Sequence, residues 1–473
     1  MGRNTGSDAA AVKERSVIQP RRRTVSAPSE ADSWAAGAEV KLPEGLEQLE
    51  AVHPPAEFDE FDSDGNPILE GLSPFTRSEG MRYATAILEN AGVKKGDVVG
   101  LIINADDPEQ CDAANMIIDA GYRSGVHVEL TVPGHVGEEH MQALLESDAT
   151  FIQLSSFTPP DAEPVEIDEA TAWEQEALVA GSVSATSDED GLAAWNAYSQ
   201  AKNANEVRWS ISMWPTRAWA KSVYPELEPD EAFRQLGKDI RYLARCSDED
   251  DENTWREHIA ALKRRADFLN GMQVEKLEIS GGGTELEVDI ARGADFLPCE
   301  WETKRGSTVC VNVPTEEIFT TPDPKKARGR IQATKPLVWI DPLTRESQVI
   351  EGVWARIEDG EIVEVGCKDP AQRELLDRIF TAELGTNRLG ELGLVGQESR
   401  VVELGRTFNN TIIDENAGLH FGFGNSFDSI TGGEGNRGKA HYDVSCGNDE
   451  TVIYAVGKDG RREKIMERGR WLI

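Results

Sequence analysis

The spacing of apolar residues in the first half of the chain predicts helices and short strands in alternation. Apolar residues recur at helical spacing over residues 82–91, and residues 98–103 form a short apolar run of the kind found in buried strands. The same order repeats, with a helical pattern over residues 111–120 and an apolar run over 126–132. A further run over 207–213 predicts another strand. This alternation is typical of a parallel α/β sheet.

The pattern changes in the second half of the chain. Residues 229–270 carry apolar positions at spacings of three, four and seven, which predict two helices. Beyond them, β-branched runs alternate with turns, and residues 309–313 and 349–357 are each expected to form one strand. The glycines at 281–283 lack a following Gly-Lys-Ser/Thr, which favours a hairpin turn over a phosphate-binding loop. With one helix expected near residues 371–384, this half is predicted to be mainly β.

These patterns divide the chain into three parts. Residues 1–40 are rich in Ser, Ala, Arg and Pro without periodicity, which is typical of a disordered tail. Residues 41–265 are expected to form an N-terminal parallel α/β domain, interrupted near residues 161–190 by an acidic surface insertion. Residues 266–473 are expected to form a mainly β, α+β C-terminal domain. The fold class predicted for the whole chain is α/β.

Composition excludes several classes of function. The chain has 85 Asp and Glu against 49 Lys and Arg, a net charge of -36, so no basic surface for nucleic acid is expected. Its six cysteines have no CxxC spacing, which argues against a zinc ribbon or a disulfide framework and favours a reducing compartment. No stretch approaches the roughly 18 consecutive apolar residues of a membrane span. We expect a cytoplasmic protein that binds neither nucleic acid nor membrane.

Two of the seven histidines lie in tight clusters with carboxylates. Glu415 precedes His420 by five residues, and Asp443 follows His441 by two. In a strand, His441 and Asp443 project from the same face and can reach the same ion. Imidazole and carboxylate groups are the usual ligands of divalent cations such as zinc and manganese. The C-terminal half is therefore predicted to carry a metal site.

Three further carboxylates stand in apolar surroundings upstream of these histidines. Glu316 and Glu317 follow the run that ends at residue 313. Adjacent side chains of a strand point to opposite faces, so at most one of the two faces a given site. Glu391 lies within the apolar segment LGELGLV, where a buried acid needs a partner. A cation is one such partner, which makes these residues candidates for the same metal site.

Four segments of the chain carry these candidate ligands. They are residues 312–323 (NVPTEEIFTTPD), 389–395 (LGELGLV), 408–424 (FNNTIIDENAGLHFGFG) and 440–447 (AHYDVSCG). Together they resemble the M29 family of metallo-aminopeptidases, the thermophilic metalloproteases, which are leucyl aminopeptidase-like. The resemblance implies a homodimeric enzyme that hydrolyses N-terminal residues from peptides. It also implies two divalent ions, of zinc, cobalt, manganese or magnesium, on Glu317, Glu391, Glu415, His420, His441 and Asp443.

Phe427 departs from the pattern of the family. The family has a tyrosine seven residues after the histidine of its third motif, whereas this chain has Phe427. Loss of a donor to the reacting carbonyl costs about 2.7–4 kcal/mol of transition-state stabilisation, or roughly 100- to 1000-fold in rate. For the proton transfer, Glu316 and Glu415 are both candidate general bases, since a Glu near a metal needs only modest tuning for that role.

Two other functions are compatible with these residues. His420, His441 and one acid also satisfy the two-His, one-carboxylate site of non-haem iron oxygenases, and ring-cleaving pyridine-diol dioxygenases resemble this family. A catalytically inactive binding protein on the same fold is the second alternative, indicated only by Phe427. Six retained ligands, more than a single iron needs, favour the aminopeptidase over both.

Overall fold

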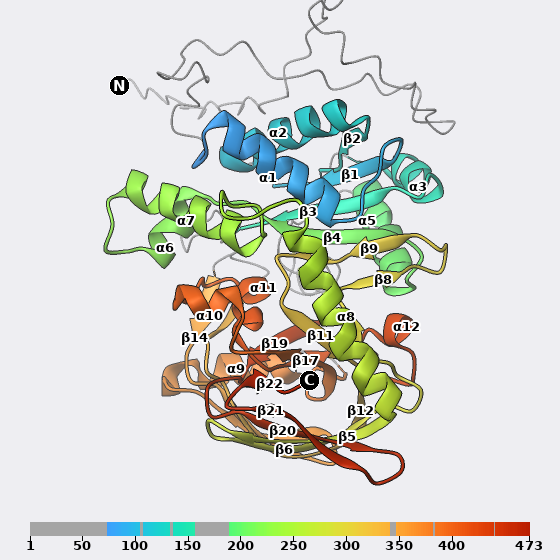
Figure 1. Cartoon of the computed structure of the whole chain (residues 1–473), viewed down its shortest axis with the longest axis vertical. Coiled ribbons are helices and arrows are strands. Elements are labelled where there is room, and N and C mark those ends of the chain that lie inside the picture. Colours follow the sequence, from blue (N-terminus) through green and yellow to red (C-terminus); the bar gives the residue numbers. More distant parts are fainter. Residues whose placement is uncertain are drawn as a thin grey trace, which may run out of the picture.

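The computed structural model describes residues 73–104, 107–132, 136–156, 189–340, 347–381, 384–438 and 440–473. The predicted tail at 1–40 and the acidic insertion as far as residue 188 lie outside them. Within the described residues, three main sheets follow one another along the long axis of the molecule (Figure 1). The parallel sheet lies at one end and two antiparallel sheets lie beyond it. The predicted fold class is confirmed.

The parallel sheet forms from short runs that are buried on both faces. Its order is β10-β4-β3-β1-β2, and every residue of β1 and β3 is buried. Parallel sheets of this kind are covered by helices, and their strands read as continuous apolar runs. The elements are β1 (Val98–Ile102), β2 (His127–Leu130), β3 (Thr150–Ser155) and β4 (Arg208–Met213), with α1 (Arg77–Asn90), α2 (Pro108–Ser124), α3 (Glu138–Glu146) and α5 (Glu189–Asn203).

One strand of the parallel sheet comes from far along the chain. The single strand expected at 309–313 is wrong, because its two ends belong to different sheets. β9 (Thr308–Cys310) pairs with β8 (Glu300–Glu302), whereas β10 (Asn312–Val313) pairs in parallel with β4. The backbone N–H of Ile211 in β4 donates to the carbonyl of Val311 at 2.6 Å. The parallel sheet is thus completed by the second half of the chain.

Two long helices lead from the parallel sheet toward the antiparallel sheets, as predicted. α7 (Pro229–Leu243) follows the short α6 (Arg217–Val223), and α8 (Thr254–Met272) runs down one side of the molecule (Figure 1). The buried positions of α8 recur at spacings of three and four, which place one face of the helix on the core. They are Trp255, Ile259, Leu262, Ala266 and Leu269.

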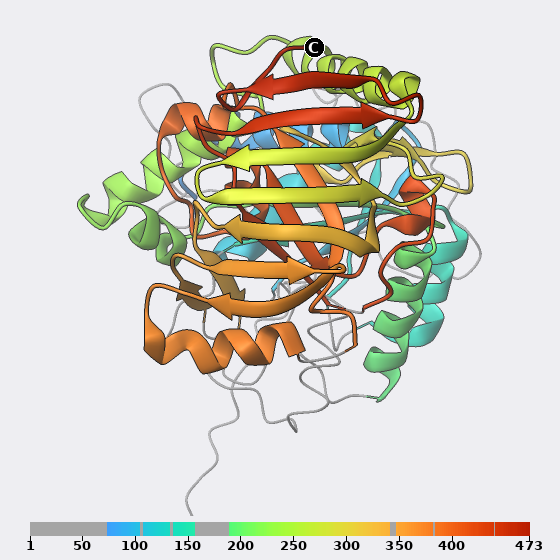
Figure 2. The ribbon, with the colours of Figure 1, turned by 90° about the horizontal axis from the view of Figure 1, so that it is seen from below.

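Two antiparallel sheets make up most of the C-terminal half. The eight-stranded sheet has the order β16-β15-β12-β6-β5-β20-β21-β22 and covers the far end of the molecule (Figure 2). The second antiparallel sheet, β19-β18-β17-β11-β7, lies between the eight-stranded sheet and the parallel sheet, and it is called the five-stranded sheet below. The strands are β5 (Val274–Gly281), β6 (Thr284–Ile290), β7 (Leu297–Pro298), β11 (Glu317–Thr320), β12 (Pro322–Gln332), β15 (Trp354–Glu358), β16 (Glu361–Gly366), β17 (Leu389–Val395), β18 (His420–Gly424), β19 (His441–Ser445), β20 (Val452–Gly457), β21 (Arg462–Glu467) and β22 (Arg470–Trp471).

The turns of this half agree with the sequence pattern at one place and differ at another. The glycines at 281–283 close the β5–β6 hairpin, as predicted. The single strand expected at 349–357 is wrong, because Gly352 adopts a left-handed conformation (φ 64°) and turns the chain between β14 (Ser347–Ile350) and β15. β14 pairs instead with β13 (Leu337–Ile340).

The helices of this half are more numerous than the sequence pattern indicates. α9 (Arg373–Thr381) occupies the place of the helix predicted near residues 371–384. The short helices α10 (Arg400–Leu404), α11 (Thr411–Asp414) and α12 (Asp428–Thr431) are not apparent from it. Each spans about one turn, which is too short for an apolar period of 3.6 residues to be recognised.

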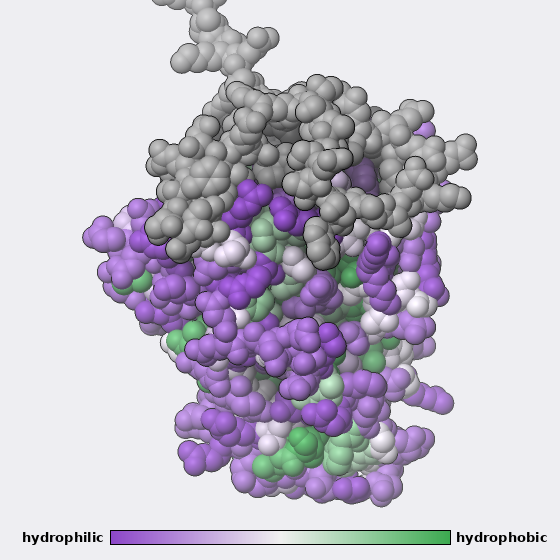
Figure 3. All heavy atoms as spheres, turned by 45° about the horizontal axis from the view of Figure 1, so that its top comes forward, coloured by the Kyte–Doolittle hydropathy of each residue, from purple (hydrophilic) through white to green (hydrophobic). Residues whose placement is uncertain are grey.

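Charge and apolar side chains separate between surface and interior. The face shown in Figure 3 is predominantly hydrophilic, in keeping with the net charge of -36. Large aromatic side chains such as Trp214, Trp219 and Trp339 are buried in the core. Among the helices in the described part of the chain, none is long and apolar enough to cross a membrane.

Candidate metal centre

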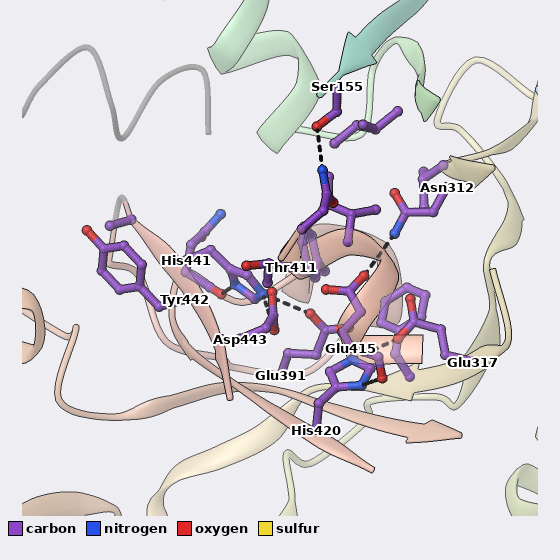
Figure 4. A pocket seen from close by; sticks show the side chains of 18 of the residues that line it. Ser155, Asn312, Glu317, Glu391, Thr411, Glu415, His420, His441, Tyr442 and Asp443 are labelled. Carbon is purple, nitrogen blue, oxygen red and sulfur yellow. Dashed lines mark hydrogen bonds and ion pairs between the residues drawn. The ribbon is translucent and has the colours of Figure 1, made fainter. Parts of the chain in front are cut away.

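Neighbouring strands of the five-stranded sheet bring the predicted ligands together. β11, β17, β18 and β19 lie side by side in antiparallel pairs, and each carries at least one ligand. A 3-10 turn just before β18 adds one more. These side chains converge on one cavity (Figure 4). In the order of the elements named they are Glu317, Glu391, His420, His441 with Asp443, and Glu415.

His420 is the centre of one group of ligand atoms. Its Nε2 lies 2.9 Å from Oε2 of Glu317. Glu391 completes a set of three with these two residues, and Glu415 and Asp443 form a second set with His420; within each set the ligand atoms lie within 4.8 Å of one another. Ligands at about 2.0–2.2 Å from a common ion lie up to roughly 4.4 Å apart, so both sets need little adjustment to hold one.

His441 is the centre of a second group. Its Nε2 lies 3.0 Å from Oε2 of Glu391 and 3.2 Å from Oδ1 of Asp443, and the three form another set within 4.8 Å. Glu391 and Asp443 therefore each belong to a set around His441 and to a set around His420. His441 and Asp443 lie on the same face of β19, as the two-residue period of a strand predicts.

Backbone carbonyls fix the orientation of both imidazoles. Nδ1 of His420 lies 3.1 Å from the carbonyl oxygen of Glu415 and 3.3 Å from that of Gly418. Nδ1 of His441 lies 2.7 Å from the carbonyl oxygen of Asn425. A carbonyl can only accept, so each Nδ1 carries the hydrogen and donates it. Each Nε2 is then the nitrogen that can bind a cation, and hydrogen bonds of this kind from Nδ1 orient metal-binding histidines.

The charges of the cluster are unbalanced. Burial raises the pKa of Glu415 well above its ordinary value, and the charges of Asp443 and Glu317 raise it further. Burial lowers the pKa of His420, but the adjacent Glu317 carboxylate, with the charges of Glu415 and Asp443, outweighs burial and raises this pKa well above its ordinary value. Four carboxylates around two imidazoles leave excess negative charge in a buried site, which a divalent cation would compensate.

Two carboxylate oxygens of the cluster fit metal ligands for a second reason. Oε2 of Glu317 and Oδ1 of Asp443 are buried, yet neither accepts a hydrogen bond of normal geometry. Such oxygens beside imidazole nitrogens suit a bound divalent cation. The other oxygen of Glu317 accepts from the Cys299 thiol at 3.3 Å, and Oε1 of Glu415 accepts from the Asn312 amide at 3.4 Å. Nothing in the sequence marks Cys299, although Asn312 opens the first of the four motifs.

Glu316 lies apart from the cluster formed by its neighbour. Both of its carboxylate oxygens accept from the Arg245 guanidinium at 2.8 Å, and one lies 3.8 Å from Nε2 of His258. The backbone N–H of Arg400 donates to it at 3.3 Å. Among the described residues, the sets that could hold a metal include Glu317 but not Glu316. The opposite orientation of adjacent side chains, which the sequence predicts, thus separates the two acids.

Phe427 stands beside the second group of ligands. It immediately precedes α12, and its ring centroid lies 5.1 Å from that of His441 and 5.9 Å from that of Phe319. The ring lines the cavity, so a tyrosine at the same position would place its hydroxyl at the cavity wall. Tyr442 lies between His441 and Asp443 in β19 and points away from the cluster in Figure 4.

The cavity over the cluster lies where the parallel sheet meets the five-stranded sheet. Its volume is about 260 Å³. Ser155 at the end of β3 faces the cluster from the side of the parallel sheet, and its hydroxyl accepts from the Asn410 amide at 3.4 Å (Figure 4). Trp209 and Ile211 of β4 contribute to the same wall. Both halves of the chain therefore form the site.

A buried cluster of carboxylates and imidazoles on the floor of a cavity defines the site of a metalloprotein. The sequence profile of the family described as thermophilic metalloprotease (M29) matches residues 81–471. The chain belongs to this family, which confirms the resemblance seen in its four motifs.

Known proteins resemble this chain both in sequence and in fold. Aminopeptidase T of Thermus aquaticus is 34% identical over 277 residues, which are 56% of this chain and 66%, just under two thirds, of that protein. Aminopeptidase PepS of Streptococcus thermophilus is 28% identical over 428 residues, 83% of this chain and 97% of that protein. The structure of wild-type AmpT from Thermus thermophilus has the same fold, with a TM-score of 0.65 and 24% identity over 84% of this chain and 100% of that chain.

Proposed function

We propose that this protein is an aminopeptidase that holds two divalent cations and removes N-terminal residues from peptides. The observation that carries the proposal is the division of six clustered side chains into sets around two separate imidazoles, His420 and His441. Glu391 and Asp443 are common to both, as expected of carboxylates between two neighbouring ions. The names of the relatives, aminopeptidases T and PepS, support the same activity.

The side chains of the cluster would divide the chemistry between them. Divalent cations held there would lower the pKa of a water molecule and polarise the scissile carbonyl. Glu415 is the proposed general base, because its carboxylate lines the cavity, whereas Glu316 is held by Arg245 away from it. Glu415 takes a proton from the attacking water and returns it to the leaving amine.

The negative charge of the cluster also explains the proposed restriction to N-termini. A peptide N-terminus carries a free amine, which only the first residue of a chain can present to carboxylates such as Glu391 and Asp443. An internal peptide bond would place an uncharged amide against the same groups, which favours it less. Zinc, cobalt, manganese and magnesium are all compatible with a set of carboxylates and two imidazoles.

The proposal is tested by metal analysis joined to an assay on amino-acid amides. The purified protein, loaded with zinc, cobalt, manganese or magnesium in turn, is expected to bind close to two ions per chain and to release N-terminal residues from peptides. One tightly bound iron with oxygen-dependent turnover and no hydrolysis would overturn it in favour of a ring-cleaving dioxygenase. Two bound metals without turnover of any amide would favour an inactive binding protein.

We further propose that the protein is a cytoplasmic homodimer, as its family membership implies. Light scattering at micromolar concentration is expected to give twice the chain mass of 51.9 kDa. A species of one chain mass alone would contradict the dimer. Peptides are the proposed partners of the site.

A further inference from the structure

A row of aromatic rings lines the cavity from the metal centre to its other end. We call Trp209, Trp301, Phe319 and Phe427 the aromatic row. Successive ring centroids in it are 6.3, 5.6 and 5.9 Å apart, and the Phe427 ring lies 5.1 Å from that of His441. All four rings line the cavity. Rings at these separations pack edge to face, so the row is a firm apolar wall.

Lys202 stands at the end of the aromatic row that is remote from His441. It lies in the last turn of α5 and lines the cavity, with Nζ 5.1 Å from the centroid of the Trp209 ring. Burial lowers the pKa of its ammonium to about 8. Within the described ranges, no carboxylate forms an ion pair with Lys202, although the sequence holds 85 acids and other lysines such as Lys326 and Lys464 have acidic partners.

An ammonium on a cavity wall that has no carboxylate partner in the described part of the chain is suited to an anion from outside the protein. Holding a lysine there without a carboxylate costs free energy of desolvation, which the Trp209 ring offsets only in part. An aminopeptidase substrate presents its amine to the metal centre, so the groups that reach the far end belong to later residues of the peptide. The charged groups available there are the C-terminal carboxylate of a short peptide and an acidic side chain.

We propose that Lys202 binds a carboxylate of the peptide substrate. The aromatic row then packs against the part of the peptide that lies between Lys202 and the metal centre. The inference rests on the proposed aminopeptidase function and makes it more specific: the enzyme prefers short peptides with a carboxylate beyond the scissile bond. A cavity of about 260 Å³ is smaller than the roughly 300–1,000 Å³ of pockets for drug-sized ligands, which fits a peptide of very few residues.

The test compares matched peptides that differ only in a carboxylate. The free acid and the amide of Leu-Gly-Gly report on the C-terminal group, and Leu-Asp-amide and Leu-Asn-amide report on the side chain. We expect kcat/KM to be about tenfold or more higher for the acid in at least one pair, as a charge-assisted hydrogen bond allows. The pair that shows the preference identifies the source of the carboxylate.

Variants assign the preference to Lys202. Lys202→Met keeps the length of the side chain and is expected to bring the ratio of kcat/KM within each pair toward 1, whereas Lys202→Arg is expected to retain it. Lys221→Met, which removes an exposed lysine of α6, controls for the change in net charge and is expected to keep the wild-type ratio.

Failure of this inference can be distinguished from failure of the aminopeptidase proposal. Hydrolysis of all four peptides with equal kcat/KM, or an unchanged ratio in Lys202→Met, would overturn the role of Lys202 and leave the aminopeptidase intact. If no peptide is hydrolysed, calorimetric binding of the same pairs to the metal-loaded protein decides, and equal affinities for acid and amide would overturn the inference.

Discussion

Gly393 lies directly across the sheet from His420, and a β carbon added to Gly393 would overlap Nε2 of that imidazole. Gly422 pairs with Asp443 rather than with His441, but a β carbon there would come within 2.5 Å of Cε1 of the His441 imidazole. Side chains of directly paired residues lie on the same face of a sheet. Glycines at these two positions therefore provide the space in which the imidazoles lie close to the backbone and meet the carboxylates.

Gly393→Ala is expected to remove metal from the site while leaving the sheet folded. The added methyl group displaces His420, which is too tightly held by backbone carbonyls to move without losing its orientation. Inductively coupled plasma analysis after dialysis measures the metal. Gly271→Ala in α8, where a β carbon meets nothing within 4 Å, serves as control and should keep full metal content. Normal metal content in Gly393→Ala would refute the steric role.

His420→Ala and Asp443→Asn are each expected to lose metal and hydrolytic activity together. His420 and Asp443 each belong to two of the three overlapping sets, so each change removes a ligand atom from both. Loss of a ligand weakens the binding of the cation on which hydrolysis depends. Metal analysis and amide hydrolysis are measured on the same samples. Asp267→Asn, on an exposed carboxylate of α8, is the matched control. Retained activity in a variant without metal would contradict metal-dependent hydrolysis.

Phe427→Tyr is expected to keep metal and to raise kcat. A phenol at this position beside His441 would supply the transition-state donor that the family pattern includes, worth up to roughly 100- to 1000-fold in rate. Phe268→Tyr, on the partly exposed face of α8, adds a hydroxyl elsewhere and should leave kcat unchanged. A Phe427→Tyr variant with unchanged kcat would show that another group already serves as donor.

Arg245→Met is expected to destabilise the protein by about 3–5 kcal/mol, because it leaves the buried Glu316 carboxylate without its partner. Burial raises the pKa of Glu316, and the Arg245 charge opposes that rise. The double variant Arg245→Met with Glu316→Met should recover most of the loss. Urea unfolding of the two single variants and the double variant measures the coupling. Additive effects would show that the pair does not act as a unit.

Asp239→Asn is expected to stabilise the protein at pH 8 and to have little effect at pH 4. Burial raises the pKa of Asp239 from 3.8 to about 7, where it accepts from Tyr224 and Gln235. The unfolded state therefore releases this proton at lower pH, so wild-type stability falls as pH rises from about 4 to 7, by as much as ~4 kcal/mol.

Urea midpoints at the two pH values measure the effect of Asp239→Asn. Asp377→Asn, on an exposed carboxylate of α9, is the control and should show no such dependence on pH. An Asp239→Asn variant that is less stable than wild type at pH 8 would show that Asp239 is charged there and contributes through its hydrogen bonds.

The parts of the site that depend on local periodicity could be predicted from the sequence. His441 and Asp443 share a face because they are two residues apart in one strand, and Glu316 and Glu317 diverge because they are adjacent. The buried acid at Glu391 likewise indicated a partner, which the structure supplies as His441. In the fold, the long helices α7 and α8 and the β5–β6 hairpin are confirmed. They could be predicted because a helical period and a glycine turn each depend on residues that are close together in the sequence.

Other features depend on partners that are distant in the sequence. Glu316 is bound by Arg245, which lies 71 positions away in the sequence and carries no local signal of that contact. Residues 309–313 divide between β9 and β10 because β10 pairs with the edge of β4. The five residues themselves carry no pattern that indicates this division. The sequence therefore left both Glu316 and Glu415 as candidate general bases, and it gave one strand where there are two.

The place of β10 at the edge of the parallel sheet has a consequence for biosynthesis. The chain is made from its N-terminus, and β4 leaves the ribosome well before Asn312 and Val313. Until those two residues arrive, the outer edge of β4 presents unpaired backbone groups, which are a template for association with other chains. The nascent protein is thus exposed to association with other chains until synthesis has gone beyond the first metal-site motif.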